Sequence, residues 1–269
     1  MQTKLKLTAL AGAVALALGA GQASAKVENS LFGGFSQTGG ELLLQVWDVA
    51  TETGYTRDLG INFKNMSTPE QVAAMAAGTT ILSYTADANW ANFMGGVSDL
   101  ANLQWGLLVG ESIGNASVYT TTPVGQRVLV PNSNVAATVL NGYDVYLAQL
   151  NARPEQQVAG DWSSITHVGE EGYWPEPTGF SADWLPKEET AFGESLAFWR
   201  IAWSGNTTTG NVATQFLGLG GAPALWSLAQ DGTLTFAVAA VPEAETWALL
   251  GLGLLGAGAV ARRRSRALA

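Results

Sequence analysis

The sequence contains no cysteine and only one histidine, His167, among its 269 residues. The absence of thiols excludes disulfides, cysteine nucleophiles and cysteine-based zinc sites, so the apolar core must supply the stability. A single histidine also excludes a histidine-rich metal site. A Ser-His-Asp triad would have to use His167 as its base, and the chain has no Gly-x-Ser-x-Gly motif to accompany it. We therefore expect no metal, no cofactor and no triad-based catalysis.

Charged residues are scarce as well, at 13% of the chain against about 25% in typical soluble proteins. Residues 26–240 hold seven basic and twenty acidic side chains, a formal charge of −13. Such a body repels phosphate backbones, which argues against nucleic acid as a partner. Its polar surface must be built from Thr, Ser, Asn and Gln, which favours strands and turns over long solvent-facing helices.

Residues 1–25 have the order of a secretory signal peptide. Lys4 and Lys6 precede the apolar stretch LTALAGAVALALGA, and Ala23-Ser24-Ala25 supplies the small residues of a cleavage site. This pattern predicts an N-terminal signal helix on an exported protein, with a mature body that begins at Lys26.

Residues 26–240 predict a single, mainly β domain, like a β-sandwich, with one or two short helices. Short apolar runs separated by Gly, Pro, Asn and Asp clusters predict the strands, and no long internal repeat is evident. The segment ELLLQVWD at residues 41–48 predicts a strand buried on both faces. The other predicted strands cover residues 54–63, 80–84, 104–109, 117–121, 126–130, 196–203, 214–217, 225–230 and 233–238.

Two helices and one turn have their own signals. Thr68-Pro69-Glu70-Gln71 is a capping-box sequence and predicts a short helix that ends near Gly78. Residues 135–150 predict a longer helix with Tyr146 and Leu150 on its apolar face. Asp231-Gly232 predicts a two-residue type I′ turn between the last two strands.

Residues 161–189 are rich in Gly, Pro, Trp and acidic residues and predict a long excursion from the regular elements. Trp162, Trp174 and Trp184 would suit stacking on sugar rings, which makes a carbohydrate-binding module one alternative function. The plainer interpretation places these tryptophans in the core. A glycoside hydrolase that uses two of the nearby carboxylates is a further alternative, although we assign no catalytic residue. These carboxylates are Glu170, Glu171, Glu176 and Asp183.

Residues 241–269 form a tail with three parts. Pro242-Glu243 comes first, fifteen uncharged residues follow from Trp247 to Ala261, and a basic cluster comes last. As a helix the uncharged stretch would extend about 22 Å, which is short for a hydrocarbon core of about 30 Å. The positive-inside rule keeps the basic cluster cytoplasmic and the body outside. The cluster consists of Arg262, Arg263, Arg264 and Arg266.

This arrangement resembles the PEP-CTERM sorting signal of Gram-negative bacteria, with Ala244 where the second proline is usual. The resemblance implies that an exosortase, a membrane transpeptidase-like protease, cuts near Pro242-Glu243 after transient insertion of a C-terminal transmembrane helix. The body would then reach the cell surface or extracellular matrix. The resemblance also implies an association with exopolysaccharide and biofilm production, with extracellular polysaccharide as a partner. It assigns no enzymatic activity to the body, for which we expect a structural role.

Overall fold

The computed structural model describes residues 40–62, 65–111, 117–128, 146–153, 157–158, 161–173, 191–202 and 211–240. The predicted signal peptide and the C-terminal sorting segment lie outside these ranges. Within them, no helix is both long enough and apolar enough to cross a membrane.

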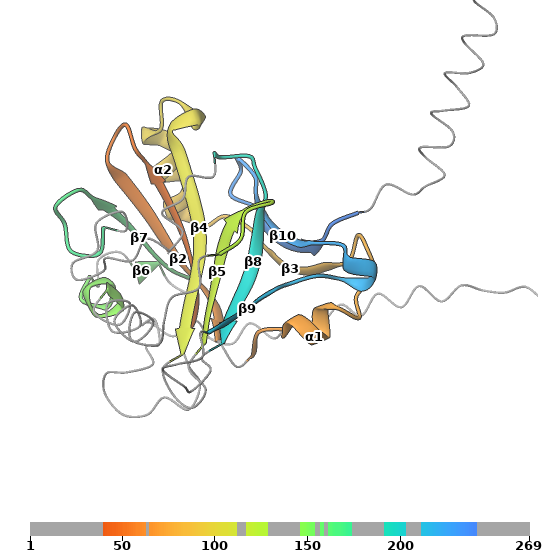
Figure 1. Ribbon diagram of the computed structural model, residues 1–269. Helices are drawn as coiled ribbons and strands as arrows, with labels where there is room; N and C mark the ends of the chain where they lie inside the picture. The colour runs from red at the N-terminus through yellow and green to blue at the C-terminus, as the bar shows by residue number, and fades with distance from the viewer. Residues whose placement is uncertain are drawn as a thin grey trace, which may run out of the picture.

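Eleven strands among the described residues join into one antiparallel sheet (Figure 1). Their order is β3-β11-β10-β8-β5-β4-β1-β2-β7-β6, and β9 pairs with β8 beside this path. The bounds are β1 Glu41–Asp48, β2 Thr53–Asn62, β3 Thr80–Tyr84, β4 Leu103–Glu111, β5 Ser117–Pro123, β6 Gln157–Val158, β7 Asp161–His167, β8 Leu196–Ala202, β9 Val212–Gln215, β10 Ala224–Leu228 and β11 Leu234–Val238. The prediction of a mainly β domain is confirmed.

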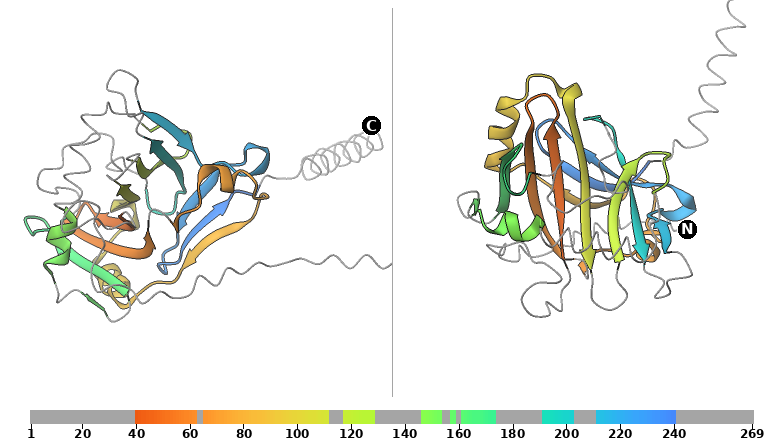
Figure 2. Two further views of the ribbon diagram at one scale, coloured as in Figure 1. Left: turned by 90° about the horizontal axis from the view of Figure 1, so that it is seen from below. Right: turned by 60° about the vertical axis from the view of Figure 1, so that its left-hand side comes forward.

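The sheet is strongly curled, so that β10, β11 and β3 turn toward β1 and β2 (Figure 2). The expected sandwich of two sheets is thus replaced by one hydrogen-bonded sheet that folds over itself. A bulge contributes to the bend, because the register of β1 and β2 shifts between Glu41 and Leu43. On the β2 side Gly60 has a φ of 62°, and its N–H donates to Asp58 Oδ1 over 2.7 Å.

The larger core fills the concave face of this sheet. All eight residues of β1 are buried, as the two-faced strand predicted from ELLLQVWD requires. Aromatic rings from the other half of the sheet complete this core, with centroids 4.8 Å apart for Phe198 and Phe216 and 4.7 Å apart for Trp226 and Phe236. Contacts between rings at such distances stabilise the fold beyond the burial of their area.

A second core lies on the convex face of the sheet, under the helical residues 146–151. Tyr146 and Leu150 are fully buried there, on the face predicted from the sequence; the earlier part of that predicted helix lies outside the described residues. Tyr146 Oη and Thr56 Oγ1 share a hydrogen bond of 2.8 Å. Burial raises the pKa of Tyr146, so its phenol stays neutral.

Two short helices connect the strands. The capping box of α1 (Pro69–Val72) is confirmed, since Gln71 N–H donates to Thr68 Oγ1 and Thr68 N–H donates to Gln71 Oε1. Its regular part ends at Val72, and turns continue to Gly78. Helix α2 (Ala88–Gly96), which the sequence did not predict, begins at Asp87 and buries Trp90 and Phe93 against the concave core.

Three local predictions are wrong. Residues 126–128 form no strand, because the chain turns after β5. Residues 161–167 form strand β7, paired with β2, although they were assigned to an irregular excursion. The turn between β10 and β11 is longer than two residues: Ala229 N–H donates to Thr233 O, and only Gly232 has a positive φ, 81°. Asp231 instead uses its Oδ1 to accept a hydrogen bond from Thr233 N–H.

Gly232 offers a test of how tightly this turn packs against α2. A Cβ at residue 232 would lie 2.5 Å from Trp90 Cδ1 and 2.6 Å from Ala86 Cβ, whereas a Cβ at Gly125 would meet nothing within 4 Å. Both glycines have a positive φ. Gly125→Ala should therefore cost only the backbone strain, about 1 to 2 kcal/mol. Gly232→Ala adds overpacking and should lower the free energy of unfolding by roughly 2 to 5 kcal/mol.

Urea titration followed by tryptophan fluorescence measures both losses. Equal losses for the two variants would contradict the tight packing of the turn against α2.

Candidate functional site

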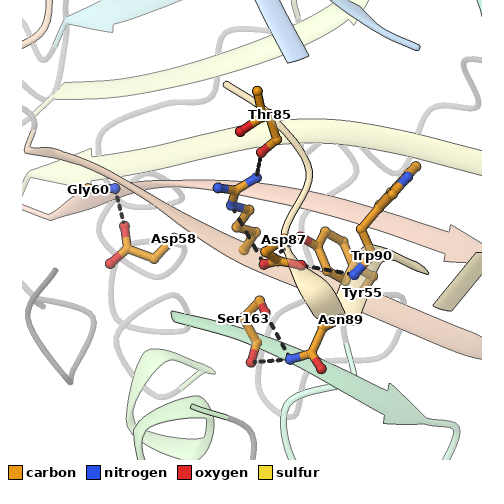
Figure 3. Close-up of polar contacts among 9 residues, drawn as sticks. Tyr55, Asp58, Gly60, Thr85, Asp87, Asn89, Trp90 and Ser163 are labelled. Carbon is orange, nitrogen blue, oxygen red and sulfur yellow. Dashed lines mark hydrogen bonds and ion pairs between the residues drawn. The ribbon is translucent and has the colours of Figure 1, made fainter. Parts of the chain in front are cut away.

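A buried ion pair stands at the centre of the polar cluster in the concave core. Arg57 Nε lies 3.7 Å from Asp87 Oδ2, and both side chains are buried. Tyr55 Oη donates to the same carboxylate oxygen over 3.0 Å (Figure 3). Arg57 Nη1 donates to the carbonyl oxygen of Thr85. Arg57 and Tyr55 reach Asp87 together because alternate residues of β2 point to the same face.

The other oxygen of Asp87 caps helix α2. Oδ1 accepts a hydrogen bond of 2.9 Å from Trp90 N–H, as an N-cap carboxylate does. The first turn of α2 is also attached to β7, because Asn89 Nδ2 donates a hydrogen bond to Ser163 Oγ over 2.9 Å (Figure 3). Both oxygens of Asp87 are thus engaged by groups of the protein itself. The cluster fastens α2 and the end of β3 to strands β2 and β7.

Tyr84 lies at the end of β3, near this cluster. Burial raises the pKa of Tyr84, and the positive charge of Arg57 opposes that effect only in part. The phenol therefore stays neutral beside the ion pair.

The only histidine, His167, is the last residue of β7, and its side chain is exposed. Glu170 Oε2 accepts a hydrogen bond from His167 N–H over 3.0 Å and lies 3.2 Å from Arg153 Nη2. The hydrogen bond from the His167 backbone, helped by the positive charge of Arg153, lowers the pKa of Glu170. This carboxylate closes a turn and ties it to the end of the helical residues 146–151.

The other residues of the predicted excursion are placed only in part. Glu171 is exposed next to Glu170, while Glu176 and Asp183 lie outside the described residues. Trp162 is 2% exposed and packs in the convex core. Its ring therefore offers no open face to a sugar. Trp174 and Trp184, the other two candidates for stacking, lie outside the described residues.

Among the described residues, no group of three or more His, Asp or Glu side chains is arranged to hold a metal ion.

The C-terminal end of the domain is held by three backbone hydrogen bonds. Val238 N–H donates to Thr79 O over 2.9 Å, and Gly78 N–H donates back to Val238 O over 2.9 Å. Ala239 N–H then donates to Pro223 O over 2.8 Å. The chain therefore leaves the sheet directly after Ala239, from a strand that lies between two others.

The tail that follows matches a known sorting signal. The PEP-CTERM protein-sorting motif matches residues 240–264, which include Pro242, Glu243 and the uncharged stretch from Trp247 to Ala261. The motif indicates an exported protein that an exosortase processes at the membrane. The chain is thus an exosortase substrate, and the resemblance of its tail to the PEP-CTERM signal is confirmed. No curated protein and no solved structure matched the chain.

Removal of the charge on Asp87 tests the buried ion pair. Asp87→Asn keeps an N-cap side chain on α2 but leaves Arg57 buried without its carboxylate, which should lower the free energy of unfolding by about 3 kcal/mol. Asp99 is a matched control, because it caps a short 3₁₀ helix through Ala101 N–H and is exposed. Asp99→Asn should change the free energy of unfolding by less than about 0.5 kcal/mol. A loss for Asp87→Asn no larger than that of the control would refute the role of the pair.

Glu170 predicts a small pH dependence of stability. Because its pKa is lowered in the folded state, its contribution is present above its ordinary pKa of 4.5 and is lost as the pH falls through the lowered value. Solvent screening at this partly exposed pair keeps the contribution below about 1 kcal/mol. Glu170→Gln should therefore flatten the acid side of the stability profile, measured by thermal unfolding across pH, whereas Glu171→Gln should leave it unchanged. Identical profiles for the two variants would count against the interaction.

Proposed function

We propose that this protein is a structural component of the cell surface or extracellular matrix, without enzymatic activity, associated with exopolysaccharide and biofilm. The observation that carries the proposal is the PEP-CTERM motif at residues 240–264, which begins directly after the last hydrogen-bonded residue of the β domain. A signal peptide at residues 1–25 takes the chain across the membrane. The C-terminal stretch holds it there as an inner-membrane intermediate until exosortase releases the body.

The tail has the physical properties of a temporary stop. Fifteen uncharged residues would cover only about 22 Å as a helix, less than a bilayer core of about 30 Å. The basic cluster from Arg262 to Arg266 opposes passage through the membrane. A short apolar stretch followed by a basic cluster suits a segment that holds the protein in the membrane until cleavage and is then removed.

A structural role for the body is supported by how its polar groups are used. Asp87 and Glu170 each have several partners within the protein and hold a helix and a turn in place. A surface with few charges and many hydroxyl and amide groups suits a hydrated polysaccharide matrix, since such groups exchange hydrogen bonds with sugars. Extracellular polysaccharide is the partner that this surface fits.

The two alternative functions are supported by fewer residues in the structure than the sequence suggested. Carbohydrate binding by residues 161–189 lacks the contribution of Trp162, which is buried, and depends on Trp174 and Trp184. A glycoside hydrolase would need two carboxylates across a cleft, and Glu170 is engaged in a turn by Arg153 and His167. A matrix role without catalysis is therefore the proposal we carry forward.

Mass spectrometry of the C-terminus tests the processing. In the native host, the mature protein should end near Pro242-Glu243, and deletion of the exosortase should restore a C-terminus at Ala269. Glu243→Ala should strongly reduce cleavage, because it removes the acidic residue of the motif. Glu245→Ala is the matched control, since it removes the same charge two residues further along, and it should be processed like the wild type.

Ala244→Pro completes the Pro-Glu-Pro pattern and should be cleaved at least as efficiently as the wild type. An intact Ala269 in cells that contain the exosortase would refute the processing, and so would equal cleavage of the Glu243 and Glu245 variants.

A further inference from the structure

Three segments form the end of the domain from which the tail departs, and we call this region the exit surface. It consists of residues 72–79, from the last residue of α1 onward, residues 217–223 around the 3₁₀ helix η4 (Leu219–Gly221), and residues 239–240. Leu219 N–H donates to Met75 O over 2.8 Å, and Ala239 N–H donates to Pro223 O over 2.8 Å. Leu217 and Pro223 form a further isolated bridge. These contacts place all three segments around the point where the chain leaves the sheet.

The exit surface contains no charged residue, although the body of the protein has many acidic ones. Its exposed side chains are small or apolar. Leu219 is 63% exposed and Leu217 is 36% exposed, so two leucines project from a surface made mainly of alanine and glycine. Single exposed leucines are common on proteins, but an uncharged exposed surface around a membrane-directed tail requires an explanation. The exposed alanines are Ala73, Ala74, Ala76, Ala77 and Ala240.

The length of the tether limits what can cover this surface. Only residues 240–246 separate Ala239, the last residue of the described part with a backbone hydrogen bond, from Trp247, where the uncharged stretch begins. Seven residues span at most about 25 Å when fully extended. A domain of about 200 residues has a radius of gyration of about 16 Å, so the tether cannot carry the opposite side of the domain to the bilayer. The exit surface is the part of the domain that this tether holds closest to the lipid.

We propose that the exit surface rests on the lipid bilayer while the C-terminal stretch is inserted, with Leu217 and Leu219 at the boundary between the headgroups and the acyl chains. This inference rests on the proposed function, because it requires the tail to enter the membrane. Transfer of leucine side chains from water to the interface lowers the free energy of the system. Anionic lipids repel the acidic body but not an uncharged surface, so the domain is seated on this end.

Seating the domain in this way presents the cleavage motif at a defined depth. Pro242 and Glu243 follow Ala239 by three and four residues, so they lie at the headgroup level when the exit surface contacts the bilayer. A protease embedded in the membrane acts at that level. After cleavage the two leucines alone form too small an apolar surface to retain the domain, and the body is released.

Fluorescence from single cysteines tests the contact, because the chain has no cysteine of its own. The full chain is labelled with a polarity-sensitive dye at Leu219→Cys, Val49→Cys or Leu254→Cys and reconstituted in phosphatidylethanolamine and phosphatidylglycerol vesicles with brominated acyl chains. Val49 is the control, since it is 49% exposed and lies in the turn between β1 and β2. Residue 254 reports insertion of the tail.

Quenching at residue 219 should be at least about threefold stronger than at residue 49, because bromines quench only dyes that approach the hydrocarbon. Two glutamate substitutions, one inside and one outside the exit surface, test the contact further. Leu217→Glu should reduce the quenching at residue 219 toward that of residue 49. Val212→Glu, a change at an exposed apolar residue of β9 outside the exit surface, should leave it unchanged.

The outcomes separate this inference from the proposed function. Quenching at residue 254 without quenching at residue 219 would overturn the membrane contact and leave the sorting function intact. Absence of quenching at residue 254 would overturn tail insertion, and with it both proposals. Self-quenching between labelled chains at residue 219, independent of bromine, would show that a second copy covers the surface and would also overturn the membrane contact.

Discussion

The buried carboxylate of Asp87 is the interaction on which the curled architecture depends. Strands β3 and β2 have six other strands between them in the order of the sheet. Asp87 follows β3 and receives Arg57 and Tyr55 from β2, so one side chain joins the two halves across the concave core. A buried charge is costly unless it is paired, and the cost of separating this pair opposes any opening of the curl. The aromatic core can therefore pack inside a sheet whose β3 edge is held at a fixed distance from β2.

The elements with strong local patterns were predictable from the sequence. ELLLQVWD has no polar alternation, and the strand it forms is buried on both faces. Thr68 and Gln71 are three residues apart in a capping box, and the reciprocal hydrogen bonds are present. The tail was recognisable because its three parts occur in a fixed order within a short segment. In each case the controlling interactions lie within a few residues of one another.

The features that were missed depend on distant partners. Strand β7 has buried hydroxyl side chains at Ser163, Ser164 and Thr166. It begins a segment, residues 161–189, whose Gly, Pro, Trp and acidic residues predicted an excursion. The hydroxyl side chains are buried because β7 pairs with β2 and because segments distant in the sequence cover this strand, such as α2, whose Asn89 donates a hydrogen bond to Ser163. Helix α2 has an N-cap signal at Asp87, but its sequence of Asn, Gly and aromatic residues has weak helix propensity. The pairing of Asp87 with Arg57 could not be deduced from spacing, since the two residues are thirty positions apart and belong to different elements.

The position of β11 also sets an order on the formation of the domain. Among the described residues, β11 is the last strand along the chain, yet it lies inside the sheet, between β3 and β10. Strand β3 pairs with β11 and with no other strand among the described residues, so β3 must wait for a partner about 150 residues further along. Such non-local pairing is slow and cannot begin before the final strand is available. In the export that we propose, led by the N-terminus, the sheet closes only when the residues next to the sorting motif have emerged, so the fold would be completed as the sorting segment reaches the membrane.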